Sequence, residues 1–377
     1  MLSADPYAPA HRRRGGRLWL AIGLPVAALA VVIGVVLAML ALPPTQVSPR
    51  AQGGPLAGPQ PSESIVDGSP SAMGPSLSAT PSPSASGQAS TTAKPSPRKP
   101  VPPCADCGQP PFAAAGGKAW KVTFNEEFDG SDYDHDHLTP CFDWNTGGCT
   151  NSFNNGREHY QSSQVRVSGG TAKLVAAPLS PALKADGCQN GTCTYKSGLL
   201  STARPNANNG SGYLYKFTYG YVESRFKVPA GRGFFTAFWM LPTDTSFHYR
   251  SEIDILEMLG DDPSTMFMTY NYDDRTQSYA VNKGKGNNGA CAVKDYSKDF
   301  VRMGVDWEPH RIAWYIDGKM CAQYTDASQI ENGPMQIILN LMVDVDWQRR
   351  WGVGLADPSL TRQLEVDYLR VYQQVPA

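Results

Sequence analysis

Short apolar runs separated by Gly, Asn, Asp and Pro fill the chain from about residue 113 to its end. In residues 221–228, apolar side chains alternate with charged ones, which is the period of two typical of a half-buried strand. No long segment in this region has the period of an amphipathic helix. The pattern predicts strands at residues 121–128, 171–176, 219–228, 234–240, 252–258, 266–272, 301–307, 311–316, 335–343 and 363–373.

These strands favour an all-β fold. A dozen or so strands over roughly 265 residues suit one antiparallel β-sandwich, because two stacked sheets bury the faces that a single sheet would leave in water. The Asp-Gly pair in IDGK, residues 316–319, predicts a tight hairpin between two of the strands.

A different pattern stands near the start of the chain. Residues 18–42 form an apolar run of 25 residues without a charge, long enough as a helix to cross a bilayer. The arginines in residues 1–17 predict that this basic tail stays in the cytoplasm and that the rest lies outside. A cleaved signal peptide is the alternative, although its apolar region usually has only about 7–15 residues. We expect a single-pass membrane protein with an extracytoplasmic domain, or a secreted domain if the run is cleaved.

Composition separates this apolar run from the strands. Residues 43–112 are rich in Pro, Ser and Ala, cannot bury a core, and are expected to form a disordered stalk before a domain at 113–377. Residues 1–103 carry eight Lys/Arg and three Asp/Glu, whereas the remainder carries 25 and 31. Because an acidic domain lacks the basic surface that phosphates require, nucleic acid is not expected as a partner.

All eight cysteines lie beyond residue 103. An even number of cysteines in an exported chain indicates disulfides, and proximity favours Cys141 with Cys149 and Cys188 with Cys193. The sequence does not fix the complete pairing. The CADC sequence at 104–107 could be half of a zinc site, but no second CxxC or HxxxH accompanies it.

Three acids share one apolar strand in SEIDILEML, residues 251–259. Glu252 and Asp254 are two residues apart and lie on the same face, whereas Glu257 should point into the core, where a carboxylate is costly. One extra residue near 255–256, a β-bulge, would return Glu257 to the face of the other two, and bulges are common beside active sites. The sequence therefore predicts that three carboxylates converge on one solvent-facing side of a sheet.

Converging carboxylates can cleave a glycosidic bond. One attacks the anomeric carbon and another protonates the leaving oxygen, at a separation of about 5–5.5 Å in retaining enzymes. A third acid raises the pKa of its neighbours, which helps to keep the general acid protonated. An acidic calcium site or a solvated edge strand is the alternative from spacing alone. The aromatic residues of FFTAFWMLP, residues 234–242, suit stacking on sugar rings.

The segments YGYVESRFKVPAGRGFFTAFWMLP (219–242) and SEIDILEMLGDDP (251–263) resemble glycoside hydrolase family 16, the laminarinase and lichenase group of β-glucan hydrolases. Similar segments flank them: FNEEFDG (124–130), DWEPHRIAWYIDGK (306–319), ILNLMVD (338–344) and VDYLRVYQ (366–373). The resemblance covers about residues 120–373. It implies a β-jelly-roll of two curved antiparallel sheets, a substrate cleft on the concave face, and a retaining mechanism.

The resemblance also implies roles for single residues. Glu252 corresponds to the nucleophile, Glu257 to the acid/base, and Asp254 to an assisting carboxylate between them. Trp239 matches a position that stacks on sugar. Further candidates for cleft contacts are Asn154, Glu158 and Trp347.

A structural calcium is often present in the family, and the matching positions are Glu127, Gly170 through its carbonyl, and Asp367. Oxygen ligands suit this cation, and surface acids that bind nothing are the alternative. No cofactor is expected for the chemistry itself. The chain departs from the laminarinase pattern at Asn271, where a histidine is common, which puts a strict β-1,3-glucan preference in doubt.

We therefore expect a monomeric, retaining endo-glycosidase that hydrolyses β-1,3-glucan, mixed β-1,3-1,4-glucan or a related polysaccharide. A transglycosylase that remodels envelope polysaccharide is an alternative. A non-catalytic carbohydrate-binding module is another, although a binder has no need of three mutually repelling acids in one strand.

Overall fold

The computed structural model describes residues 108–145, 149, 154–207, 211–243, 251–273, 275–282 and 284–377, apart from the side chains at 347 and 350. The expected basic tail at 1–17, the apolar run at 18–42 and most of the stalk at 43–112 lie outside these residues. So does the CADC sequence at 104–107. In the part that the structure describes, no helix is long and apolar enough to span a membrane.

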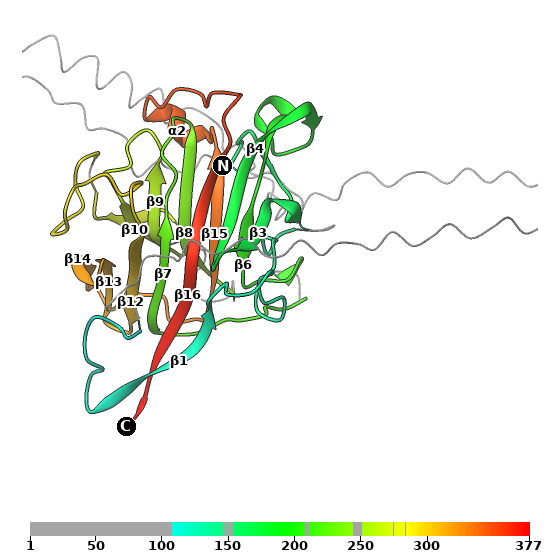
Figure 1. Ribbon diagram of the computed structural model, residues 1–377. Helices are drawn as coiled ribbons and strands as arrows, with labels where there is room; N and C mark the ends of the chain where they lie inside the picture. Colours follow the sequence, from blue (N-terminus) through cyan, green and yellow to red (C-terminus); the bar gives the residue numbers. More distant parts are fainter. Residues whose placement is uncertain are drawn as a thin grey trace, which may run out of the picture. The chain divides into compact units, whose positions relative to one another are not determined.

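The described chain is built almost entirely of strands (Figure 1). The strands are β1 (Lys118–Glu126), β2 (Glu158–Tyr160), β3 (Val165–Ser168), β4 (Thr171–Lys184), β5 (Thr192–Ser197), β6 (Leu199–Ser201), β7 (Gly220–Lys227), β8 (Phe234–Pro242), β9 (Glu252–Leu259), β10 (Phe267–Tyr272), β11 (Gln277–Ala280), β12 (Val301–Glu308), β13 (Arg311–Ile316), β14 (Lys319–Tyr324), β15 (Met335–Val343) and β16 (Arg362–Pro376). Short helical turns complete them: η1 (Ser162–Gln164), η2 (Gln189–Gly191) and α2 (Asp346–Arg350).

The strands form two sheets. The larger has ten strands in the order β14-β13-β12-β7-β16-β4-β5-β2, with β1 beside β16 and β3 beside β4. The smaller has six strands in the order β11-β10-β9-β8-β15-β6. Figure 1 shows β16 running between β7 and β4, with β1 along its C-terminal half. The expected two-sheet sandwich is therefore confirmed, and its pairs are antiparallel except for the parallel pair β2–β5.

One hydrophobic core lies between the two sheets. β7 contributes Val222 and Phe226 to this core, and β8 contributes Phe238 and Met240 from the other sheet. β7 is buried on both faces, because Glu223 on its other face is 1 % exposed. The expectation of a half-buried strand is therefore wrong for β7: Arg302, Tyr221 and Tyr368 form hydrogen bonds with Glu223 and cover that face.

Local sequence signals account for several connections. Asp317 and Gly318 both have a left-handed φ, of 49° and 78°, and form the two-residue turn between β13 and β14 that the Asp-Gly pair predicts. The disulfides Cys141–Cys149 and Cys188–Cys193 are confirmed. A third disulfide joins Cys291 to Cys321.

The folded unit begins before the expected boundary at residue 113. The Phe112 ring packs against Trp120, Tyr221 and Tyr315 on the outer face of the ten-stranded sheet, at centroid distances of 5.6, 5.6 and 5.2 Å. The Trp120 indole also donates a hydrogen bond to the Phe112 carbonyl at 3.0 Å. Phe112 is therefore part of the domain and not of the stalk, because an aromatic ring gains most from burial beside other rings.

Candidate active site

β9 lies inside the six-stranded sheet and carries the carboxylate triplet, Glu252, Asp254 and Glu257. Against β8, Glu257 pairs with Ala237 and Asp254 pairs with Trp239, so partners two residues apart on β8 are three apart on β9. The register between β9 and β10 shifts at the same place. β9 therefore contains one extra residue here, and the predicted bulge is confirmed.

The bulge separates the side chains of β9 between two faces. Ile253, Ile255, Leu256 and Met258 belong to the core between the sheets. The β8 partners of Asp254 and Glu257 belong to a different apolar cluster, on the other face of the six-stranded sheet. Since residues paired across strands lie on one face, the triplet lies on the face turned away from the ten-stranded sheet.

Each of the first two acids has a partner that holds it. The Arg275 guanidinium donates a hydrogen bond to Glu252 Oε2 at 2.9 Å and forms an ion pair with it. The Asn271 amide donates to Asp254 Oδ2 at 3.2 Å, and the Trp314 indole donates to the Asp254 carbonyl at 2.9 Å. Asp254 is 3 % exposed and also forms a hydrogen bond with Glu252.

Burial and mutual repulsion favour the protonated forms of two of the acids. Burial raises the pKa of Glu257 to about 8, and the Glu252 charge contributes to the same shift. Burial, followed by the charges of Glu252 and Glu257, raises the pKa of Asp254 well above its ordinary value. The site therefore places a carboxyl group paired with an arginine beside Glu257, whose raised pKa favours its protonated form, so it can both attack a carbon and donate a proton.

The comparison with known families decides the assignment. The model of glycosyl hydrolases family 16 matches residues 188–369, which include all three acids. This part of the chain is a glycoside hydrolase family 16 domain. Members of family 16 need no cofactor for catalysis.

Curated and solved relatives with glucanase names agree with this assignment. The chain is 31 % identical to the endo-1,3-1,4-beta-glycanase ExsH of Rhizobium meliloti (strain 1021), over 55 % of this chain and 39 % of that protein. It is 30 % identical to the beta-glucanase of Rhodothermus marinus, over 42 % of this chain and 59 % of that protein. The X-ray structure of the endo-beta-1,3-glucanase from Pyrococcus furiosus matches with a TM-score of 0.52 and 26 % identity, over 71 % of this chain and 98 % of that one. The matched stretch spans less than two thirds of either curated relative.

Trp239, the expected sugar platform, lies beside the triplet in the family 16 domain but is 5 % exposed. Its indole donates to Asn340 Oδ1 at 2.8 Å, and the Asn340 amide donates to the Tyr160 hydroxyl at 3.0 Å. Trp144 and Trp351 are partly buried against the same cluster and expose more of their rings. These two rings are candidates for sugar stacking that sequence patterns did not single out.

The other three residues expected to contact sugar in the cleft are Glu158, Asn154 and Trp347. Glu158 is 0 % exposed and accepts a hydrogen bond from the Val343 backbone N–H at 2.8 Å, so its expected role as a cleft contact is wrong for this conformation. Asn154 is exposed, and its carbonyl accepts a hydrogen bond from the Asp346 backbone N–H at 3.3 Å. Trp347 follows in α2, although its side chain lies outside the described part. The structure therefore brings the Asn154 and Trp347 segments together, and their contacts with sugar stay predictions.

The residues expected to bind calcium do not fit that cation. Glu127 accepts hydrogen bonds from Arg370 Nε and Nη2, both at 2.7 Å, and Asp367 accepts one from Arg225 Nη1 at 2.6 Å. Gly170 lies in the turn between β3 and β4. Among the described residues, no group of three or more His, Cys, Asp or Glu side chains could hold a metal. Two arginines neutralise the two carboxylates, so the expected calcium site is replaced by ion pairs.

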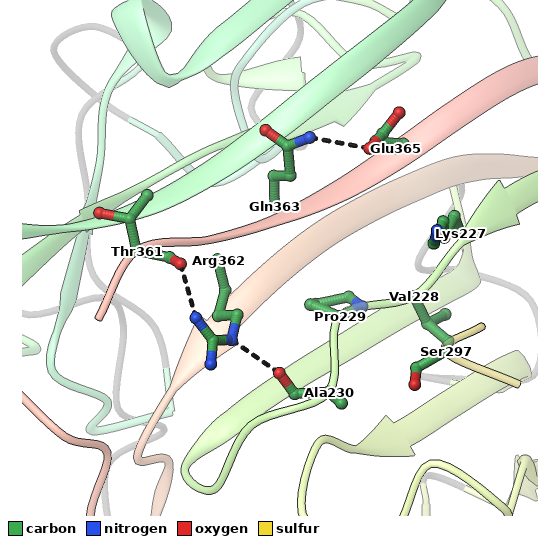
Figure 2. A pocket seen from close by; sticks show the side chains of 9 residues that line it. All are labelled: Lys227, Val228, Pro229, Ala230, Ser297, Thr361, Arg362, Gln363 and Glu365. Atoms are coloured by element: carbon green, nitrogen blue, oxygen red, sulfur yellow. Dashed lines mark hydrogen bonds between the residues drawn. The ribbon is translucent and has the colours of Figure 1, made fainter. Parts of the chain in front are cut away.

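A pocket elsewhere in the domain is separate from the triplet. Figure 2 shows it between the end of β7 and the start of β16, lined by Lys227, Arg362 and Glu365 among others. The Arg362 guanidinium donates to the carbonyls of Ala230 at 2.7 Å and Thr361 at 3.0 Å. No member of the carboxylate triplet lines this pocket, so it does not extend the candidate active site.

Proposed function

We propose that this domain is a retaining endo-glycosidase that cleaves β-1,3-glucan or mixed β-1,3-1,4-glucan outside the cytoplasm. The observation that carries the proposal is the carboxylate triplet: a bulge brings three acids to one face, Arg275 pairs with Glu252, and burial raises the pKa of Glu257 to about 8. The named activities of the Rhizobium and Pyrococcus relatives support this choice of polymers.

The first step joins the sugar to the protein. One oxygen of Glu252 attacks the anomeric carbon and forms an ester with it. The bond from that carbon to the leaving oxygen breaks, and its electron pair stays on the leaving oxygen, which takes the proton of Glu257. The step needs one ionised and one protonated carboxyl group, which the Arg275 ion pair and the burial of Glu257 both favour.

The second step releases the sugar. A water molecule gives a proton to Glu257, and its oxygen bonds to the anomeric carbon. The ester bond breaks, and its electron pair returns to Glu252. Two inversions at one carbon leave the product with the β configuration of the substrate. Asp254, which forms hydrogen bonds with Asn271 and Glu252, would keep the attacking carboxylate in position during both steps.

The proposed location outside the cytoplasm rests on the cysteines and on the apolar run. Three disulfides, Cys141–Cys149, Cys188–Cys193 and Cys291–Cys321, occur among the described residues. Such bonds form and persist in oxidising compartments and are rare in the cytosol. Attachment to the membrane through residues 18–42 is part of the same proposal, and the apolar sequence of that segment supports it.

The purified protein and its variants Glu252→Gln and Glu257→Gln test this function. New reducing ends would be measured on mixed-linkage β-glucan, laminarin and agarose. We expect the parent to cleave one of the glucans, Glu252→Gln to fall to background, and Glu257→Gln to lose about 10²–10⁴-fold in rate. Asp295→Asn, which alters an exposed acid paired with Lys298 in a loop, is the matched control and should keep full activity.

Three results would contradict this proposal. A folded parent that releases no reducing ends from any glucan would remove the hydrolase function. Products longer than the starting oligosaccharide, in place of shorter ones, would identify a transglycosylase. Cleavage that persists in Glu252→Gln at the parental rate would show that the triplet is not the site of the chemistry.

A further inference from the structure

Arg275 is a cation in contact with the triplet that neither the sequence pattern nor the family resemblance singled out. It lies in the turn between β10 and β11, and its Nη1 is 2.9 Å from Glu252 Oε2. The Arg275 side chain is 43 % exposed and that of Glu252 is 18 % exposed. The pair therefore stands where the triplet meets solvent, whereas Asp254 is buried beside it.

The turn is built to bring this side chain back over the sheet. β10 places Asn271 opposite Glu252 and ends at the next residue, Tyr272, so the turn follows directly beside the triplet. Asp273 and Arg275 both have a left-handed φ, of 51° and 57°, which is uncommon for residues other than glycine. Thr276 stabilises the turn, because its backbone N–H and its hydroxyl both donate to the Asp273 carbonyl, at 3.0 and 2.6 Å. A strained backbone held in this way points to a function for the side chain it carries.

The charges around Glu252 are unbalanced without this arginine. On its own strand Glu252 faces Asp254 and Glu257, and each of these acids is affected by the Glu252 charge. β10 presents the neutral Asn271, and the β8 partner of Asp254 on the same face is the uncharged Trp239. Within the described part of the chain, Arg275 is the cation that acts on the triplet.

We propose that Arg275 is a positioning residue that makes Glu252, and not Asp254 or Glu257, the ionised acid of the triplet. The inference rests on the proposed function, in which Glu252 attacks and Glu257 donates the proton. A guanidinium stays charged over the whole working pH range, so it favours the ionised form of the carboxyl group it touches. It donates to Oε2 of Glu252, which holds one oxygen of the carboxylate in place.

The same contact bears on the second step. While the ester is present, Glu252 carries no charge and Arg275 has lost its ionic partner. The negative charge returns to Glu252 as the ester breaks, and Arg275 then stabilises the developing carboxylate. Removing the arginine should therefore slow the release of the sugar as well as the formation of the ester at low pH.

Four proteins test the inference: the parent, Arg275→Gln, Arg275→Lys, and the control Lys285→Gln, which removes a cation paired with Asp261 in a neighbouring loop. The dependence of kcat/KM on pH would be measured on the glucan that the parent cleaves. We expect the acidic limb of the Arg275→Gln profile to move to higher pH by about one unit, because an adjacent guanidinium favours a carboxylate by about 1–3 units. Arg275→Lys should restore part of this shift, and Lys285→Gln should match the parent.

A second measurement does not depend on activity. In protein labelled with ¹³C at the glutamate carboxyls, the signal of residue 252 would be assigned by its loss in Glu252→Gln and followed with pH. We expect this signal to titrate about one pH unit higher in Arg275→Gln than in the parent. An inactive parent that shows this shift would overturn the proposed function and leave the arginine effect intact. An unchanged titration, or a faster reaction at every pH in Arg275→Gln, would overturn the inference, because Arg275 would then be a spectator or an obstacle.

Discussion

Glu158 is an acid whose role is set by burial. It is 0 % exposed, and its Oε2 accepts the Val343 N–H in the strand next to β8. Gly156 leaves room for it, because a Cβ at that position would lie 2.8 Å from Glu158 Oε1. Glu158 also forms a hydrogen bond with Tyr160, whose hydroxyl accepts one from Asn340, the partner of Trp239. Glu158 therefore supports the outer face of the six-stranded sheet, although the family resemblance suggested a contact with sugar.

The stability of the domain should depend on the protonation of Glu158. Burial raises the pKa of Glu158 to about 8 from an ordinary value of 4.5, so the folded protein binds more protons than the unfolded chain between these two values. The free energy of unfolding of the parent, relative to Glu158→Gln, should fall as pH rises through this window, by up to about 1.4 kcal/mol per pH unit. Urea unfolding of both proteins at pH 5, 6, 7 and 8 measures the difference. If the free energies of unfolding of the two proteins differ by the same amount at every pH, the pKa of Glu158 is not raised by folding.

At the scale of strands, alternation and turn chemistry predicted much of the fold. Each of the ten predicted strands overlaps a strand of the structure, because long buried strands show their period clearly. The bulge in β9 was predictable because a strict period of two would have placed Glu257 in the core. The two-residue turn at Asp317 and Gly318 followed from its dipeptide.

Other elements left no readable signal in the sequence. β2, β3 and β6 have only three or four residues each, too few to show a period. The β2–β5 pair is parallel and depends on contacts distant in the chain. The Arg275 ion pair and the burial of Glu158 depend on how a turn and a neighbouring strand approach the sheet, which alternation along one strand does not report.

Deleting Ile255 tests the bulge directly. The deletion removes the extra residue of β9, so the restored alternation would turn either Glu257 or the pair Glu252 and Asp254 toward the core. We expect activity on glucan to be lost and the free energy of unfolding to fall. The control is Ile255→Ala, which keeps the bulge. It should lower the free energy of unfolding by about 2–5 kcal/mol, because it leaves a cavity in the core.

The comparison would be made at a temperature where circular dichroism shows both Ile255 variants folded. Ile255→Ala should keep the parental kcat there, because its register and its triplet are unchanged. A folded deletion variant with parental kcat would contradict the role given to the bulge.

At the scale of the whole domain, the outer faces of the two sheets differ in what they carry. The outer face of the ten-stranded sheet is closed by ion pairs such as Arg302–Glu223 and by the Phe112 ring. The outer face of the six-stranded sheet carries the triplet, with Trp144 and Trp351 partly buried around its apolar cluster. One face is thus closed by packing and ion pairs, and the other carries the groups for chemistry, which fits a family 16 glycosyl hydrolase.

The central claim is that Glu252 attacks the anomeric carbon while Glu257 donates the proton. The anomeric form of the first product tests it most directly, because attack by Glu252 and then by water retains the configuration of the sugar. Proton nuclear magnetic resonance would follow the cleavage of mixed-linkage β-glucan from the first minutes. Our account predicts that the β-anomer of the new reducing end appears first and that the α-anomer follows by mutarotation. Initial release of the α-anomer would show a single inversion, and Glu252 would then not be a nucleophile that forms an ester.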